Sequence, residues 1–222
     1  MEAFAKIQRD KEIACKKHEI DIQNPTVNGS KFYIFVKRCF DIIISVIAGI
    51  LLFIPMMIIA LLIKLDSKGP ALFKQERLGK GGKPFIMYKF RSMCIDAEAN
   101  GPKWAEKNDG RCTKLGAKLR KSRIDELPQL INIIKGEMSF VGPRPERACF
   151  YEQFEEYIPG FHNRLLVQPG LTGHAQVNGG YDLKPEEKIL YDMEYIKNRS
   201  FRMDLQCILK TVSVIFSHRG AR

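Results

Sequence analysis

An adjacent acid pair, Asp125 and Glu126, follows the most basic stretch of the chain, in the segment SRIDELPQLINIIKGEMSFVGPRP. Residues 111–123 carry no acid and six cations: Arg111, Lys114, Lys118, Arg120, Lys121 and Arg123. An opposite charge within a few ångströms favours the ionised form of a carboxyl group, so we expect a carboxylate here to be charged at neutral pH. Such a carboxylate can bind a cation or act as a nucleophile.

A short helix is predicted over residues 126–134. Proline is tolerated in the first turn of a helix and disrupts its interior, so Pro128 marks the helix start. Asp125 is then the N-cap, and Gly136 ends the helix. The partial positive charge of a helix N-terminus suits a carboxylate or a phosphate. The simpler alternative is that Asp125 is only a cap and Glu126 only a solvated acid, since Asp is among the commonest caps.

The elements around the acid pair must fit one sizeable core, because the chain has 222 residues. Its formal net charge of +11 predicts anionic partners, such as a phospholipid surface or a nucleotide. No nucleic acid is expected as a partner, because neither a recognition helix nor a stacking-aromatic module accompanies the charge. The six cysteines show no C-x-x-C pair, so we interpret them as reduced thiols of a cytoplasm-facing protein.

Residues 42–63 form an apolar run without a charge, long enough to span a bilayer if straight. Pro55 lies inside it and removes the hydrogen bond to the carbonyl of Leu51, which bends the helix. Both flanks are basic, and positive flanks favour the cytoplasmic side. We therefore expect a re-entrant hairpin that enters one leaflet and returns, with a kinked spanning helix as the alternative. Arg38 and Asp41 are expected to pair at its entrance.

Residues 71–78 and 85–93 are predicted to be two strands joined by a turn at 79–83. Lys89 and Arg91 lie two apart and so share a face of the second strand. Two cations on one face suit a diphosphate, and a solvated hairpin surface is an equal alternative. Residues 113–121 are predicted to be a helix with a basic stripe that faces anionic lipid, or simply solvent.

Arg144 stands between two prolines in VGPRPE, which hold it in an extended pose. A rigid guanidinium suits bidentate phosphate recognition, and a buried arginine joining two loops is the alternative. The segment QPGLTG, residues 168–173, is expected to bring backbone amides close to a ligand. Residues 181–198 and 204–216 are predicted to be amphipathic helices. His162 and His174 receive no role.

The quoted motifs resemble the monotopic phosphoglycosyl transferases, or bacterial sugar transferases. The resemblance runs from KRCFDIIIS through GPALFKQERLG, YKFRSM, the acid-pair segment and VQPGLTGHAQVNG to DLQCILKTVSVIF. It implies an α/β protein, mostly helical with a small β-hairpin, and a monotopic membrane association. We expect three parts: a polar extension 1–30, a re-entrant membrane hairpin 31–68 and a cytoplasmic catalytic domain 69–222. The chain resembles a compact member that carries the catalytic module alone.

The resemblance implies transfer of a sugar 1-phosphate from a UDP-sugar to polyprenyl phosphate, with release of UMP. Asp125 matches the nucleophile that forms a phosphosugar intermediate, and Glu126 completes the acid pair. Both acids are the expected Mg²⁺ ligands, and Mg²⁺ is the expected cofactor. The expected substrate and phosphate-binding residues are Lys89, Arg91, Arg123, Arg144 and Arg77.

The expected setting is the cytoplasmic face of the bacterial cell (inner) membrane, with the lipid bilayer as a partner and glycan assembly as the process. Homo-oligomerisation is left open by the sequence. The alternative of another class is a non-catalytic membrane-surface scaffold that binds anionic lipid through its basic face.

Overall fold

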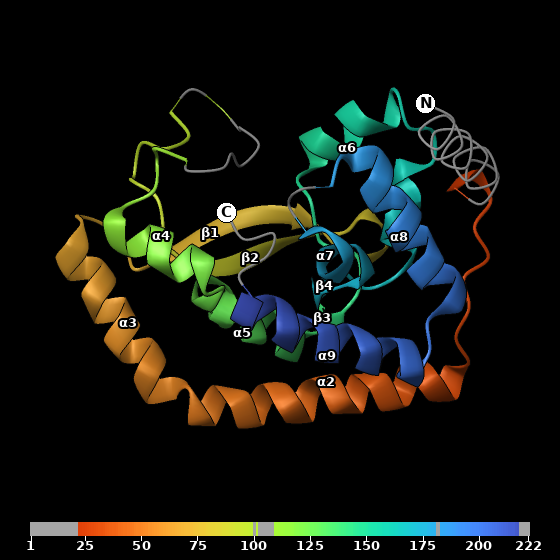
Figure 1. Ribbon diagram of the computed structural model, residues 1–222, viewed down its shortest axis with the longest axis horizontal. Helices are drawn as coiled ribbons and strands as arrows, with labels where there is room; N and C mark the ends of the chain where they lie inside the picture. Colours follow the sequence, from red (N-terminus) through yellow and green to blue (C-terminus); the bar gives the residue numbers. More distant parts are fainter. Residues whose placement is uncertain (1–21, 100, 102–108, 181–182, 218–222) are drawn as a thin grey trace, which may run out of the picture.

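The computed structural model describes residues 22–99, 101, 109–180 and 183–217. Most of the predicted extension 1–30 therefore lies outside the described residues. Two consecutive helices frame a body of further helices and two small sheets (Figure 1). The helices of the framing pair are α2 (Lys31–Leu51) and α3 (Phe53–Asp66). This confirms the mostly helical α/β class with a small hairpin.

The break between α2 and α3 follows from Pro55, as predicted. Proline has no amide to donate to the carbonyl of Leu51, and the helix breaks at Leu52 with a bend of 63°. Neither helix by itself is long and apolar enough to cross a bilayer, as far as the described residues go. The bent pair together has the length and composition to do so.

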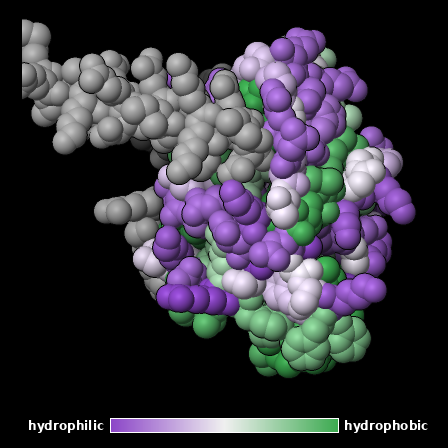
Figure 2. Space-filling view, turned by 90° about the vertical axis from the view of Figure 1, so that its right-hand side faces the viewer, coloured by the Kyte–Doolittle hydropathy of each residue, from purple (hydrophilic) through white to green (hydrophobic). Residues whose placement is uncertain are grey.

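The outer faces of α2 and α3 are strongly apolar. Figure 2 shows hydrophobic side chains gathered along the lower margin of the molecule, at the level of α2 in Figure 1, beneath a largely hydrophilic body. The exposed apolar side chains of the two helices include Phe32, Phe35, Ile47, Ile50, Leu51, Phe53, Ile54, Met57, Leu61 and Leu65. A contiguous exposed apolar surface of this kind marks a site of association.

The predicted hairpin is present as β1 (Leu72–Leu78) and β2 (Pro84–Phe90), paired antiparallel with Phe73 opposite Lys89. A short 3₁₀ turn, η1 (Lys80–Gly82), joins them. Helix α4 (Lys114–Lys121) follows, with Thr113 as its N-cap. A Cβ on Gly116 would lie 2.0 Å from the carbonyl oxygen of Ser92, so only glycine lets α4 approach the chain beyond β2.

The prediction of a single helix around the acid pair is wrong about where the helix starts and which residue caps it. The chain forms a 3₁₀ segment, η2 (Ile124–Gln129), and only then the α-helix α5 (Leu130–Lys135). Asp125 lies inside η2, while Arg123 precedes it in the left-handed conformation with φ of 57°. Pro128 lies inside η2, where it has no amide to donate to a preceding carbonyl. Gly136 ends α5 in a left-handed conformation, as predicted.

In the segment 168–173, the Gly170 amide is used within the fold. Strand β4 (Gly170–Thr172) pairs in parallel with β3 (Ser139–Val141), and the Gly170 amide donates to the Pro143 carbonyl at 2.9 Å. A Cβ on Gly170 would lie 2.1 Å from the Gly142 nitrogen. Gly170 therefore allows the two backbones to pack closely, and this packing supports the VGPRP segment.

The remaining helices build the main core. They are α6 (Ala148–Glu155), the 3₁₀ segment η3 (Phe161–Leu166), α7 (His174–Asn178), α8 (Pro185–Asn198) and α9 (Phe201–Ser217). The core buries Tyr151, Phe161, Ile189 and Ile196. Helices α8 and α9 match the two predicted amphipathic helices. His162 and His174 contact Glu155 and Glu194.

Buried polar contacts attach α2 to this body. Asp204 of α9 accepts hydrogen bonds from Tyr33 and Tyr195, each at 2.8 Å, and forms an ion pair with Lys37 at 2.9 Å. The predicted pair of Arg38 and Asp41 is wrong, because each has a partner in another element.

Arg38 donates to the Ile133 and Ile134 carbonyls in the last turn of α5, at 2.6 and 2.8 Å, and the Ile133 carbonyl also accepts from the Gly136 amide at 3.0 Å. Asp41 accepts from the Phe140 amide at 3.1 Å. These bonds fix α2 against the elements that follow the acid pair.

Candidate active site

The acid pair is buried in η2, between α4 and α5: Asp125 is 7% and Glu126 6% exposed. Glu126 Oε1 lies 2.5 Å from Arg144 Nη2 and 3.6 Å from Lys89 Nζ. The solvated-acid alternative for Glu126 is therefore wrong. The structure brings β2, η2 and the VGPRP segment together at this carboxylate.

The two carboxyl groups are driven in opposite directions. Burial opposes ionisation of Glu126, but Arg144 and Lys89 outweigh burial and hold its pKa well below its usual range. For Asp125, burial and then the charge of Glu126 raise the pKa to about 6, against the pull of Lys89, Arg120 and Arg144. Arg144 and Lys89, which lie outside the basic stretch 111–123, thus keep Glu126 ionised. Asp125, although its pKa is raised, stays mostly ionised at neutral pH, as expected.

Asp125 lies in the wall of a cavity of about 290 Å³. Both β-strands, the loop 91–98 and the segment 144–150 contribute to the lining. Eight Lys or Arg side chains line it: Arg77, Lys89, Arg91, Arg111, Arg120, Arg144, Arg147 and Lys188. A cavity with this charge is suited to an anion of several charges, such as a diphosphate.

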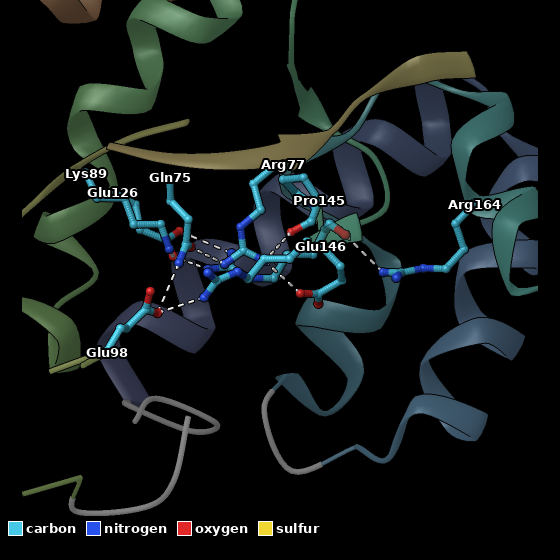
Figure 3. Close-up of polar contacts among 10 residues, drawn as sticks. Gln75, Arg77, Lys89, Glu98, Glu126, Pro145, Glu146 and Arg164 are labelled. Atoms are coloured by element: carbon cyan, nitrogen blue, oxygen red, sulfur yellow. Dashed lines mark hydrogen bonds and ion pairs between the residues drawn. The ribbon is translucent and has the colours of Figure 1, made fainter. Parts of the chain in front are cut away.

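Further along β1, a polar network lines the same cavity (Figure 3). Arg77 Nη1 binds Glu146 Oε2 at 3.0 Å, and Arg147 Nη1 binds Glu98 Oε1 at 2.8 Å. Gln75 joins the two pairs, accepting from Arg77 Nη2 at 2.5 Å and donating to Glu98 Oε1 at 3.3 Å.

A buried chain of contacts holds Arg144 from behind. Arg164 Nη2 donates to the Arg144 carbonyl at 3.0 Å, and Arg164 Nε binds Asp192 Oδ2 at 2.7 Å. The side chains of Arg164 and Asp192 are each 1% exposed, and the Arg164 guanidinium packs 4.8 Å from the centre of the Phe161 ring. Arg144 itself joins the VGPRP segment to η2 through Glu126, so phosphate recognition and the structural link both remain open for it.

Asn132 fixes α5 to the edge of β2. Its side chain accepts from the Tyr88 amide at 3.1 Å and donates to the Ile86 carbonyl at 2.7 Å. The amide group therefore imitates a neighbouring strand, and Asn132 is fully buried. This bond pair sets the position of η2 and α5 relative to Lys89.

The predicted phosphate-binding residues divide into those close to the acid pair and those held elsewhere. Lys89 and Arg144 contact Glu126. Arg77 and Arg91 line the same cavity, but Arg91 donates to the carbonyls of Ser67 and Lys68, each at 2.7 Å. Arg91 therefore caps the C-terminus of α3. Arg123 also lies near the acid pair, because its charge helps to lower the pKa of Glu126, and it lines a second cavity of about 20 Å³ together with Arg144.

Sequence reasoning did not single out several residues of the cavity: Gln75, Glu98, Arg120, Glu146 and Arg147. Glu146 and Arg147 directly follow VGPRP, so their proximity to Arg144 was a usable signal. For Glu98 the sequence contained no such signal, because the position of this residue depends on how the loop after β2 folds back.

The acid pair fits a Mg²⁺ ion only together with substrate oxygens. Across the described residues, no group of three or more His, Cys, Asp or Glu side chains is placed to hold a metal. Mg²⁺ is commonly held by one or two carboxylates with waters and substrate phosphates. Asp125 lines the cavity and matches that mode, whereas the Glu126 carboxylate is paired with Arg144 and Lys89 and does not line the cavity. The two predicted metal ligands stay a prediction.

With this geometry established, comparison with known proteins identifies the family. Residues 32–218 match the family described as Bacterial sugar transferase, and the chain belongs to it. It is 47% identical over 197 residues to a UDP-N-acetylgalactosamine-undecaprenyl-phosphate N-acetylgalactosaminephosphotransferase of Aeromonas hydrophila, covering 87% of this chain and 46% of that protein.

Two further relatives differ in length. A UDP-glucose:undecaprenyl-phosphate glucose-1-phosphate transferase of Xanthomonas campestris pv. campestris is 38% identical over 91% of this chain and 43% of its own length. The exopolysaccharide production protein PSS of Rhizobium leguminosarum bv. phaseoli is 43% identical over 80% of this chain and 93% of its own length. The chain thus spans less than half of the first two relatives and nearly all of the third.

Proposed function

We propose that this protein transfers a sugar 1-phosphate from a UDP-sugar to a membrane polyprenyl phosphate and releases UMP. The observation that carries the proposal is the buried acid pair: Asp125 lies in the wall of a cation-lined cavity, Glu126 is paired with Arg144 and Lys89, and the pKa values of the two acids shift in opposite directions. The names of the relatives, which transfer sugar phosphates to undecaprenyl phosphate, support the reaction class.

In the first step, an oxygen of the Asp125 carboxylate attacks the β-phosphorus of the UDP-sugar. The bond from that phosphorus to the bridging oxygen breaks, UMP leaves, and a phosphosugar remains on Asp125. In the second step, a phosphate oxygen of the polyprenyl phosphate attacks the same phosphorus and releases the carboxylate. Glu126 keeps Arg144 and Lys89 beside the reacting phosphate, where they offset developing charge.

A bound Mg²⁺ would neutralise part of the diphosphate charge. Asp125 and Glu126 are the proposed ligands. An anionic nucleophile approaching an anionic diphosphate needs such neutralisation, and the cavity cations contribute to it without a metal.

The proposed location is the cytoplasmic face of the bacterial cell membrane, with α2 and α3 as a re-entrant hairpin. The 63° bend, the exposed apolar side chains of both helices and the basic flanks support this arrangement. Helix α9 adds the exposed residues Leu205, Leu209 and Val212.

The reaction is tested with the purified chain, Mg²⁺, a polyprenyl phosphate and a panel of UDP-sugars. We expect UMP release, and we expect multiple turnovers only when the lipid acceptor is present. Release of UDP would indicate conventional glycosyl transfer, and release of neither nucleotide would favour the lipid-binding scaffold.

The covalent intermediate is tested without the acceptor lipid. Incubation with the accepted UDP-sugar should add one phosphosugar mass to the peptide that contains Asp125, and Asp125→Asn should abolish both the adduct and turnover. Full activity of the Asn variant would exclude this mechanism.

The hairpin is tested by cysteine labelling at both of its ends in sealed inverted vesicles. Both ends are expected on the cytoplasmic side. Labelling from opposite sides would establish a spanning helix.

A further inference from the structure

The cavity that holds Asp125 contains two carboxylates that its proposed phosphate chemistry does not use. Glu98 and Glu146 line the cavity together with eight cations. A carboxylate repels a phosphate oxygen, so these two side chains are unfavourable in a site for phosphate alone. Their presence indicates that part of the ligand there is not anionic.

The charges of the polar network balance. Arg77 and Arg147 are paired with Glu146 and Glu98, and the fifth member, Gln75, is neutral. Around the acid pair, by contrast, Lys89, Arg120 and Arg144 outnumber the two carboxylates. The cavity therefore has a cationic region at Asp125 and a neutral region built from charged and amide groups.

The two regions are adjacent along rigid elements. Gln75 and Arg77 lie on the face of β1 that also presents Phe73, the strand partner of Lys89. At about 3.4 Å per residue, Arg77 is roughly 13 Å along the strand from that pair.

Glu146 is two residues from Arg144, so their Cα atoms are at most roughly 7 Å apart. The Leu78 amide donates to the Glu146 carbonyl at 3.0 Å, which aligns the end of β1 with this segment.

A neutral network of this composition is suited to hydroxyl groups. A hydroxyl both donates and accepts, so it can donate to Glu98 or Glu146 and accept from Arg77, Arg147 or Gln75. A phosphate held by Lys89 and Arg144 would leave the groups attached to it within reach of Glu146.

We propose that Gln75, Arg77, Glu98, Glu146 and Arg147 form a hydroxyl-binding subsite for the polyhydroxyl part of the nucleotide sugar. This proposal rests on the proposed function. The hydroxyls come either from the transferred sugar or from the ribose of the nucleotide, and binding measurements separate the two.

The test uses Glu98→Gln and Glu146→Gln, each in the full chain with Asp125→Asn to prevent turnover. Glu76→Gln is the matched control, because Glu76 lies between Gln75 and Arg77 on β1, is exposed and does not line the cavity. Affinities for UDP-hexoses that differ in one hydroxyl, UMP, 2′-deoxy-UMP and pyrophosphate are measured by calorimetry with Mg²⁺.

Affinity for the best UDP-hexose should fall about tenfold or more in the test variants, since hydrogen bonds to charged groups are the strong ones. If the subsite binds the hydroxyls of the sugar, the test variants should discriminate less between UDP-hexoses and should bind UMP as before. If the subsite binds the ribose hydroxyls, the test variants should bind UMP more weakly and should prefer UMP over 2′-deoxy-UMP by a smaller factor. Pyrophosphate binding is unchanged in either case.

Three results would overturn the subsite. The test variants could bind every ligand like Glu76→Gln, or they could lose affinity equally for every ligand, pyrophosphate included. The third result is a chain with Asp125→Asn alone that binds no UDP-sugar. UMP release by the wild-type chain is assayed separately. An active wild-type enzyme, together with test variants that bind every ligand like Glu76→Gln, removes the subsite and leaves the proposed function standing.

Discussion

Asp125 and Glu126 are neighbours in the chain and are both buried, yet their pKa values move in opposite directions. Glu126 contacts Arg144 and Lys89 directly, whereas Asp125 experiences those cations at longer range and has Glu126 beside it. Groups whose environments separate their pKa values often mark a catalytic site. The arrangement leaves Glu126 as a constant charge and Asp125 as the group that titrates.

This difference predicts the pH dependence of the first step. Only the carboxylate of Asp125 attacks, so kcat/KM for UMP release should fall about tenfold per pH unit below a midpoint of about 6. Glu126→Gln removes a charge that raises the Asp125 pKa and should move the midpoint to lower pH. A profile that is flat from pH 5 to 8 in the wild type would contradict the assignment.

The same shift predicts a cost in stability. The folded-state pKa of Asp125 is above its unfolded value, so the folded state binds more protons between about pH 4 and 6. The free energy of unfolding contributed by this group therefore falls as pH rises through that window. Asp125→Asn should stabilise the fold by on the order of 1–3 kcal/mol at pH 7.5.

Little of that gain should remain near pH 4, where Asp125 is protonated in the folded state and about half protonated in the unfolded state. Thermal unfolding of the two proteins in the same detergent at both pH values measures the difference. An equal gain at both pH values would mean that the substitution acts through packing and not through ionisation.

At the scale of elements, the chain Asp192, Arg164 and Arg144 connects α8 through η3 to the VGPRP segment. Burial lowers and Asp192 raises the pKa of Arg164, with a net rise that keeps its guanidinium charged. Arg164 contacts no reacting atom in the proposed chemistry, so it is a positioning residue.

Arg164→Lys should lower kcat about 10- to 100-fold with a smaller change in KM. An ammonium group lacks the fork that binds Asp192 and the Arg144 carbonyl together, and small displacements of catalytic groups are costly. The pH midpoint should also rise, because Arg144 lowers the Asp125 pKa. Arg202→Lys, on an exposed position of α9, is the control. A loss of stability with an unchanged midpoint and kcat would indicate a purely structural role.

Pro55 determines the bend between α2 and α3, and its replacement tests that cause. Pro55→Ala restores the amide that can bond to the Leu51 carbonyl. At 1.5 Å per residue, straightening the 63° bend lengthens the distance between the outer ends by roughly 8 Å.

Spin labels at Lys31→Cys and Asp66→Cys, in a chain whose native cysteines are replaced, measure this distance. An unchanged distance after Pro55→Ala would show that packing of α3 against α4 and β2 maintains the bend without the proline.

At the scale of the whole molecule, one apolar margin lies below a basic, polar body (Figure 2). Asp204 and Arg38 attach α2 to the helices above it, so the orientation of the hairpin and that of the acid pair are linked. A membrane bound to this apolar surface would therefore hold the cavity in a fixed orientation relative to the lipid surface.

A fluorescent probe at Leu209, exposed on α9, should be quenched by lipid-soluble quenchers in vesicles containing the protein. A probe at Gln153, exposed on α6, should respond to aqueous quenchers instead. Equal aqueous quenching at both positions would place α9 away from the bilayer.

The sequence by itself determined the local features. Pro55 fixed the bend because it removes one helix hydrogen bond, the turn at 79–83 fixed the hairpin, and Gly136 ended the helix after the acid pair. The run of motifs also identified the family and the acid pair. All of these depend on residues close together in the chain, where backbone geometry leaves few alternatives.

Only the tertiary structure decided which side chains meet. Arg38 and Asp41 bind α5 and the residue Phe140 and not each other, because folding offers each of them a buried backbone partner. Arg91 is committed to the end of α3, whereas Glu98 enters the cavity from a distant loop. The opposite pKa shifts of the acid pair arise in the same way, since burial and the distance to each cation exist only once the chain is folded.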